Sequence, residues 1–341
     1  MVDSGDVGNM VAKTKHSDIM RGVTRSYCCV ARYITYTKMP DTKTVHVPHL
    51  GGIDAAYRMS PDHDSSKPTL VLVHSFMTSS KLYATQFENT QLTDRMNLIA
   101  IELLGHGQTR TKSPHFTYWD TASMNLQVLD ALGIKGKLFV LGTSQGGWIT
   151  VRMALLAPDR ITGIIPLGTC MDYESERIRE LGCWDGRAAC TGSIDEWSTL
   201  SSTPDFAPSE DFCNFLVSQG FGKGVTQADR DFWVKETRAN YAGDDGRLRA
   251  RMSAINLRDR DGLLGRLFDV RCPVLWLHGT SDPVYNVPNA EEEIKLFVNS
   301  PDARVQAVQD GAHFLSFSHP KEVNEAILGF IQKYGGSGHR L

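Results

Sequence analysis

Residues 142–146, Gly-Thr-Ser-Gln-Gly, are the part of the chain with the clearest chemical meaning, because a serine stands between two glycines. A serine hydroxyl is a poor nucleophile unless a base lies near it and N–H donors stabilise the oxyanion that forms. The glycines lack a Cβ, so the chain can turn sharply at Ser144. The N–H of Gln145 would begin a helix, where donors have no partner within the helix. The pattern therefore indicates a nucleophilic serine.

The flanking sequence supports this interpretation, since five-residue matches of this kind are common by chance. Residues 138–141 are an apolar run that predicts a buried strand, and residues 147–156 carry apolar side chains at helical spacing before Pro158. A strand that runs through Gly-x-Ser-x-Gly into a helix is typical of a nucleophile elbow, the sharp turn that exposes a reactive serine.

Two later positions offer the base and the acid that a serine nucleophile needs. Asp282 follows the apolar run 274–277, and His313 follows the run 304–308. Side chains that follow the strands of a parallel sheet converge above its carboxyl edge. Ser144, Asp282 and His313 are therefore expected to meet.

The order Ser, Asp, His along the chain resembles that of the α/β-hydrolase triad. Over residues 43–334 the sequence resembles α/β-hydrolases of the cap-bearing, fold-1 type. The resemblance implies that His313 is the general base, which takes the proton of Ser144 and later gives it to the leaving group. It implies that Asp282 holds the histidine tautomer and stabilises the imidazolium.

Residues 72–77, Leu-Val-His-Ser-Phe-Met, resemble the His-Gly-x-Pro oxyanion loop of the same family. The resemblance implies that the N–H of Phe76 is a second oxyanion donor beside that of Gln145. Two residues depart from the family pattern, since Ser75 replaces its glycine and Met77 its proline.

Further residues are expected to support the site. The resemblance implies a structural, hydrogen-bonding role for His74, and an architectural role for the loop 102–109, which contains His106. The residues expected to line or support the substrate pocket are His74, Ser75, Met77, Trp148 and Phe314.

The expected reaction is transfer of an acyl group to water through an acyl-enzyme, from an ester, lactone or thioester of a partly apolar small molecule. Dehalogenases and epoxide hydrolases resemble this chain in having a cap, but they use an aspartate where this sequence has Ser144. A β-diketone C–C hydrolase or an acyltransferase would use the same triad, and a hydrolase-like receptor would bind a small molecule with little turnover. We expect no cofactor and no metal, because the chain has no His-Glu-x-x-His, paired cysteine ligands, Walker loop or Gly-x-Gly-x-x-Gly opening a strand and helix.

The elements that position these residues follow from hydrophobic patterning. Two runs around Gly51 and Gly52 predict a β-hairpin over residues 44–48 and 53–59. Continuous apolar runs predict parallel strands at 69–73, 98–101, 138–141, 161–165, 274–277 and 304–308. Helical patterns occur at 120–132, 147–156, 290–298 and 320–332, and the acidic run 291–293 is expected to begin a helix. The prediction is an α/β fold: a mostly parallel, eight-stranded α/β-hydrolase sheet with helices on both faces and an inserted helical cap.

The alternation of strand and helix breaks between residues 167 and 271, where aromatic residues recur at helical spacing over a length far beyond a usual loop. We therefore expect a helical cap that gates an apolar pocket. The predicted organisation is a partly ordered N-terminal extension (1–42), a core (43–168 and 266–335), a cap (169–265) and a C-terminal tail (336–341).

The composition is that of an ordinary globular protein, with 341 residues, 41% of them hydrophobic and 22% charged. A net charge of −3 does not indicate a basic surface that would bind nucleic acid or an anionic membrane. The seven cysteines lack metal-ligand spacing and argue for a reducing compartment. With no signal peptide and no membrane-spanning run in the sequence, we expect a cytoplasmic protein without stable membrane anchoring, and homo-oligomer formation stays open. The C-terminal Arg340-Leu341 differs from the Ser-Lys-Leu peroxisomal address and is not taken as a signal.

Overall fold

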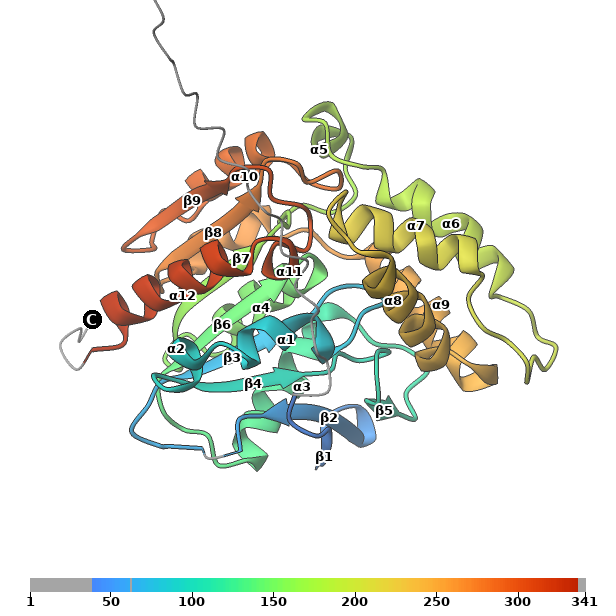
Figure 1. The fold of residues 1–341 in the computed structure, drawn as a ribbon, viewed down its shortest axis with the longest axis horizontal. Coiled ribbons are helices and arrows are strands. Elements are labelled where there is room, and N and C mark those ends of the chain that lie inside the picture. The colour runs from blue at the N-terminus through green and yellow to red at the C-terminus, as the bar shows by residue number, and fades with distance from the viewer. Residues whose placement is uncertain (1–38, 62, 337–341) are drawn as a thin grey trace, which may run out of the picture. The chain divides into compact units, whose positions relative to one another are not determined.

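A twisted, mostly parallel sheet is the scaffold that carries the site (Figure 1). The computed structural model describes residues 39–61 and 63–336. Eight strands follow one another across the sheet in the order β1-β2-β4-β3-β6-β7-β8-β9. Their bounds are β1 (Lys43–Val47), β2 (Ile53–Met59), β3 (Thr69–Val73), β4 (Asn97–Ile101), β6 (Leu138–Thr143), β7 (Ile161–Leu167), β8 (Val274–Gly279) and β9 (Ala303–Val308).

The pairing of the strands confirms the predicted fold class. The first two strands form the predicted antiparallel hairpin, β2 pairs antiparallel with β4, and every pair from β4 through β9 is parallel. A further strand, β5 (Arg110–Thr111), pairs with β2 outside this order. It was not predicted, because two residues are too few to show a periodic pattern.

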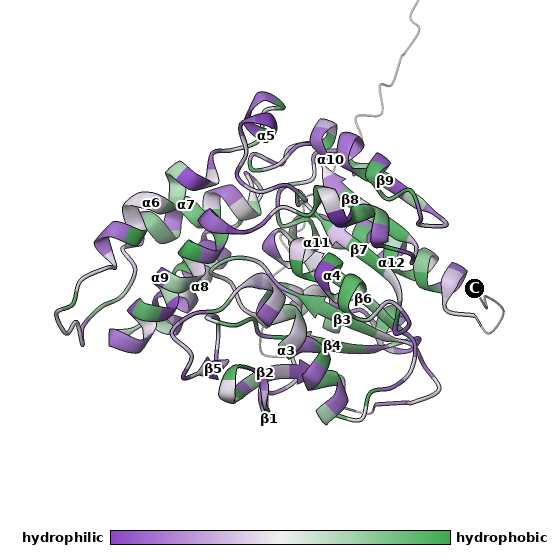
Figure 2. Cartoon of the chain, turned by 180° about the vertical axis from the view of Figure 1, so that it is seen from behind, coloured by the Kyte–Doolittle hydropathy of each residue, from purple (hydrophilic) through white to green (hydrophobic). Residues whose placement is uncertain are grey.

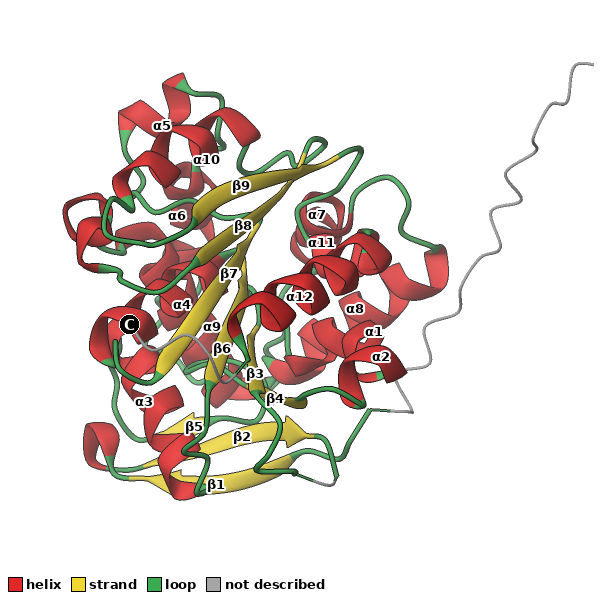
Figure 3. Cartoon of the chain, turned by 90° about the vertical axis from the view of Figure 1, so that its left-hand side faces the viewer, coloured by secondary structure: helices red, strands yellow, loops and turns green. Residues whose placement is uncertain are grey.

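Helices cover both faces of the sheet, and alternate residues of each strand face opposite ways. In β3, for example, Val71 and Val73 join the core cluster beneath α3 (Tyr118–Ala131) and α4 (Gln145–Leu156), whereas Leu70 and Leu72 join the cluster beneath α12 (Pro320–Tyr334). Figure 3 shows α3 and α4 on one side of the sheet and α12 on the other. The short elements α1 (Ala84–Phe87), α2 (Thr90–Thr93), α11 (Leu315–Ser318), η2 (His49–Gly51), η3 (Ser80–Tyr83) and η4 (Leu264–Asp269) complete the core.

Capping residues explain where the predicted helix bounds were off by a few residues. The α3 helix begins at Tyr118 because the Thr117 hydroxyl accepts from the Asp120 N–H in a capping box. The α10 helix (Val287–Glu293) begins earlier than expected because the Asn286 side chain caps it, and a 3₁₀ turn, η5 (Ile294–Leu296), follows it. The expectation that the acidic run 291–293 begins a helix was therefore wrong, since the run ends α10.

Five α-helices and no strand lie between β7 and β8 in the described chain, and these helices extend beyond one end of the sheet (Figure 1). They are α5 (Glu176–Glu180), α6 (Gly186–Glu196), α7 (Glu210–Phe221), α8 (Gln227–Asn240) and α9 (Gly243–Asp259). Figure 2 shows the contrast between the hydrophobic central strands and the hydrophilic α5. This insertion is called the cap below; the exact domain boundaries stay a prediction.

Some expectations fall on residues outside the described part of the chain. These are most of the N-terminal extension, namely residues 1–38, and the C-terminal residues 337–341 with their Arg-Leu ending. Within the described residues, every helix is too short or too polar to cross a membrane.

Candidate active site

Ser144 lies at a sharp turn between β6 and α4, as the sequence predicts. Its backbone has a φ of 55° and a ψ of −121°, a strained conformation for a residue with a side chain. The glycines on either side allow the turn, because a Cβ on Gly142 would lie 2.1 Å from the carbonyl oxygen of Gly146. A Cβ on Gly146 would lie 2.1 Å from the carbonyl oxygen of Val73 in β3. The strand and the helix thus approach more closely than other residues would permit.

His313 and Asp282 form a buried pair on the loops after β9 and β8. The distance from His313 Nδ1 to Asp282 Oδ2 is 2.9 Å, and neither side chain is more than 5% exposed. The other carboxylate oxygen accepts from the N–H groups of Val284 and Tyr285, at 2.8 and 3.1 Å. A proton on Nδ1 of His313 leaves the lone pair on Nε2, the atom that a general base uses.

The pKa of Asp282 lies well below its usual range. Burial alone would raise the pKa, but the neighbouring His313 and the hydrogen bonds from His278 and His313 more than offset burial. The carboxylate therefore stays charged, as a group that stabilises an imidazolium must.

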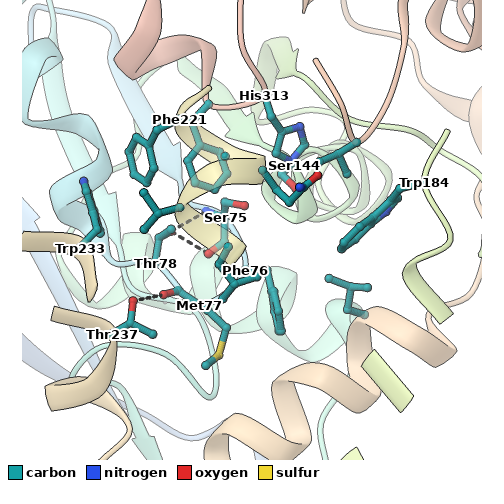
Figure 4. Close-up of a pocket in the computed structure, with 17 residues that line it drawn as sticks. Ser75, Phe76, Met77, Thr78, Ser144, Trp184, Phe221, Trp233, Thr237 and His313 are labelled. Carbon is teal, nitrogen blue, oxygen red and sulfur yellow. Dashed lines mark hydrogen bonds between the residues drawn. The ribbon is translucent and has the colours of Figure 1, made fainter. Parts of the chain in front are cut away.

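Ser144 and His313 line the same pocket (Figure 4). The pocket holds about 520 Å³ of space, part of it open to solvent. From the core it is lined by Ser75, Phe76, Met77, Thr78, Val284 and Phe314, and from the cap by Trp184, Leu216, Val217, Gln219, Gly220, Phe221, Trp233, Thr237 and Leu257. Apart from His313, every lining side chain is uncharged. The sequence did not indicate which cap residues line the pocket. It showed only that aromatic residues are abundant in this segment.

The two predicted oxyanion donors flank this pocket. Gln145 is the first residue of α4, and Phe76 lies in the loop after β3, termed here the oxyanion loop (residues 74–80). Neither N–H has an acceptor among the described residues. The two departures from the family pattern lie in a turn in which the Thr78 hydroxyl donates to the Ser75 carbonyl at 2.8 Å, and Met77 takes a φ of 54°.

His74, the first residue of the oxyanion loop, and His106 act as hydrogen-bonding partners. His74 Nδ1 donates to the Ser75 carbonyl at 2.9 Å, and its Nε2 accepts from the Leu103 N–H at 3.2 Å. His106 Nε2 accepts from the side-chain amide of Gln145 at 3.1 Å. Burial lowers the pKa of His74 to about 4 and, together with the nearby His74, that of His106 to about 3. Both histidines are therefore neutral at pH 7. Neither of them lines the pocket.

Trp148 and His278 lie behind the predicted triad. Trp148, which was expected to line or support the pocket, donates through Nε1 to the Asp172 carbonyl and is not a lining residue. His278, at the end of β8, was not singled out from the sequence. Its Nε2 lies 3.0 Å from the Tyr285 carbonyl and 3.4 Å from Asp282 Oδ2, so it helps to fix the carboxylate.

The described residues contain neither a metal-binding cluster nor a disulfide. Among them, no group of three or more His, Cys, Asp or Glu side chains is arranged to hold a metal ion. The described cysteines are buried and free: Cys170, Cys183, Cys190, Cys213 and Cys272.

Comparison with known proteins finds similarity to α/β-hydrolases. A family model described as the alpha/beta hydrolase fold matches residues 68–185. Epoxide hydrolase 3 of Siraitia grosvenorii is 24% identical over 300 residues, which cover 78% of this chain and 92% of that protein. Carboxylesterase YbfK of Bacillus subtilis is 22% identical over 270 residues, covering 77% and 80%.

Solved structures agree on the fold. A thermophilic esterase from Thermogutta terrifontis superposes with a TM-score of 0.67 at 19% identity, covering 86% of this chain and all of that one. At this identity the match bears on the fold alone, and it agrees with the family model and with the relatives. The chain has the α/β-hydrolase fold.

Proposed function

We propose that the protein is a serine-dependent carboxylic ester hydrolase that acts through an acyl-enzyme on Ser144. One observation carries the proposal: a serine on a strained elbow and a histidine paired with a buried aspartate line the same pocket. The α/β-hydrolase fold and the similarity to a carboxylesterase support a hydrolase, and a serine nucleophile narrows the expected substrates to acyl compounds.

In the proposed mechanism, the Ser144 oxygen attacks the carbonyl carbon of the ester while His313 takes the hydroxyl proton. The N–H groups of Gln145 and Phe76 would donate to the oxyanion of the tetrahedral intermediate. The intermediate collapses, the bond from carbon to the leaving oxygen breaks, and His313 returns the proton to the leaving alcohol. Water then attacks the acyl-enzyme by the same route, releases the acid and regenerates the serine. Asp282 stabilises the imidazolium in both halves.

The pocket lining supports an uncharged, largely apolar acyl group. A carboxylate or ammonium placed there would lose its hydration without meeting a charged partner, a cost of several kcal/mol or more. Because lactones and thioesters present the same carbonyl carbon, they belong to the same proposed substrate class.

The nucleophile separates this proposal from epoxide opening. Epoxide hydrolase 3 is among the relatives. Capped epoxide hydrolases resemble this chain, but their nucleophile is an aspartate at the position where this chain has Ser144. C–C bond cleavage and acyl transfer to an alcohol would use the same triad, so a substrate panel has to distinguish them.

A labelling experiment tests the proposal. We expect a fluorophosphonate to add its mass to the peptide that contains Ser144, and Ser144→Ala to abolish both labelling and turnover of short-chain esters. The panel also contains lactones, thioesters and β-diketones, and hydrolysis is followed with and without an added alcohol acceptor. Labelling at another residue, or turnover that survives Ser144→Ala, would refute the assignment.

A further inference from the structure

The oxyanion loop holds an unusual backbone conformation that its own sequence does not favour. Met77 has a φ of 54°, in the left-handed region where side chains are strained. Within the loop, Thr78 bridges back to Ser75 through its hydroxyl and its N–H. These contacts close a turn that contains Met77. At the end of the loop, the Ser80 hydroxyl donates to Glu102 at 2.7 Å and accepts from Arg58 at 3.1 Å, so the core holds that end.

The cap adds contacts to the residues between these two anchors and to Lys81, through two successive residues of α8 (Gln227–Asn240). Glu236 accepts from the Ser79 hydroxyl at 3.2 Å and from the Lys81 ammonium at 2.7 Å, one carboxylate oxygen for each. The Thr237 hydroxyl donates to the Met77 carbonyl at 3.3 Å, as Figure 4 shows. One helix turn thus contacts three positions of the chain that follows Phe76.

The ion pair between Lys81 and Glu236 is partly shielded from water. The two side chains are 25% and 16% exposed, and the ammonium also lies 5.4 Å from the centre of the Phe232 ring. A partly buried pair is screened less by salt than an exposed one, and its geometry is better defined.

From these contacts we infer that Lys81 and Glu236 form a clamp by which the cap holds the oxyanion loop in its reactive conformation, with Glu236 as a positioning residue for the N–H of Phe76. The inference rests on the proposed function, in which that N–H is an oxyanion donor. Each charge of the clamp has a partner, so the clamp acts by fixing the backbone and not by adding a net charge.

The same helix also forms part of the pocket wall, through Trp233 and Thr237. The wall that meets the substrate and the clamp that fixes the oxyanion loop are therefore parts of one rigid element. A substrate that fits against Trp233 keeps α8 in the position in which the clamp is closed. The clamp thus links recognition of the acyl group to stabilisation of the transition state.

The test compares Glu236→Ala and Lys81→Met with the charge-swapped double variant Lys81→Glu/Glu236→Lys, using a short-chain ester. We expect each single change to lower kcat about tenfold or more, short of the roughly hundredfold or greater loss on removing a whole oxyanion donor. KM should change less than about twofold, because the clamp acts on the transition state. The inhibition constant of an aliphatic trifluoromethyl ketone, which forms a tetrahedral adduct with the serine, should rise as kcat/KM falls. The swapped variant should recover most of kcat.

A matched control is Glu292→Ala, which breaks a remote Lys–Glu pair of similar length, 2.8 Å to Lys295, and should leave kcat unchanged. If Glu236→Ala does not fold, the same measurements are made on Lys81→Met, because the Lys81 side chain is partly exposed and its replacement should be tolerated. Single variants with native kcat, or a loss of kcat without a rise in the ketone inhibition constant, would overturn the clamp. If the native protein is not labelled at Ser144, the proposed function fails and the clamp falls with it. Native labelling with unaffected clamp variants would refute the clamp alone.

Discussion

Glu293 is a buried carboxyl group that takes no part in the proposed chemistry, yet it holds the loop that follows β7. Its side chain is not exposed, and it accepts from the Met171 N–H at 2.6 Å and from the Cys170 thiol at 3.3 Å. Arg177 lies 3.5 Å from it. Burial raises the pKa of Glu293 to about 7, despite these donors. The folded protein therefore keeps a proton that the unfolded chain releases near pH 4.5.

This difference makes stability depend on pH in a predictable direction. Between pH 4.5 and 7 the carboxyl of Glu293 binds more protons in the folded state than in the unfolded state, so its contribution to the free energy of unfolding falls as the pH rises, by about 3 kcal/mol. The Glu293→Gln variant cannot ionise at this position, so its free energy of unfolding should lack this decrease with pH. Urea unfolding of both proteins from pH 4 to 8 gives the difference. His74 and His106 have lowered pKa values and act in the opposite sense, losing stability as the pH falls below about 6.5, but both proteins share them. Parallel curves for the two proteins would contradict the prediction.

At the scale of elements, a buried ion pair joins the two ends of the cap, and a hydrogen bond from the same arginine reaches the loop that carries Asp282. Arg260, directly after α9, pairs with Glu174, and the two side chains are 1% and 0% exposed. The same guanidinium donates to the Tyr285 hydroxyl at 3.0 Å and lies 4.0 Å above the ring of Trp148. The Tyr285 N–H in turn binds Asp282. The cap is thus connected to Asp282 through packed side chains.

Removal of one partner of this pair should be costly. Glu174→Gln keeps the shape and the hydrogen bond from the Gly186 N–H, but leaves the charge of Arg260 buried without a counter-charge. We expect a loss of about 3–5 kcal/mol in the free energy of unfolding, measured with urea. The double variant Glu174→Gln/Arg260→Met should recover part of it. Glu325→Gln, in an exposed pair with Lys321, serves as the control and should be indistinguishable from the native protein. A similarly small effect for Glu174→Gln would mean that the buried pair does not stabilise the fold.

For the molecule as a whole, the sequence predicts most of the core and little of the cap. Buried parallel strands carry unbroken apolar runs, and the glycines at 142 and 146 mark a turn in which no Cβ fits, so the elbow could be located from local pattern. The pocket wall could not, because it is made by side chains from separate helices whose contacts depend on packing. Gly220 is an example: its lack of a Cβ lets α7 lie against Phe314, a contact with no trace in the sequence.

Because the pocket is shared by cap and core, a single cap residue should set the acyl length. Leu257 of α9 is 3% exposed and lines the pocket. Leu257→Ala should raise kcat/KM for longer acyl chains about tenfold relative to shorter ones, because the smaller side chain leaves space for a few more methylene groups of the substrate. It should also lower the free energy of unfolding by about 2–5 kcal/mol. Kinetics on esters of increasing chain length measure the shift, with Leu248→Ala, a 52% exposed residue of the same helix, as the control. Equal chain-length profiles for both variants would contradict it.

The position of the cap between β7 and β8 also matters while the protein is being made. The two strands are neighbours in the sheet although residues 168–273 separate them. At ordinary rates of synthesis, on the order of ten seconds pass between the completion of β7 and that of β8. During that interval β7 is an edge strand with unpaired N–H and carbonyl groups, open to pairing with another chain. A ribosome that stalls within the cap would therefore prolong the stage at which the nascent protein is most exposed to aggregation.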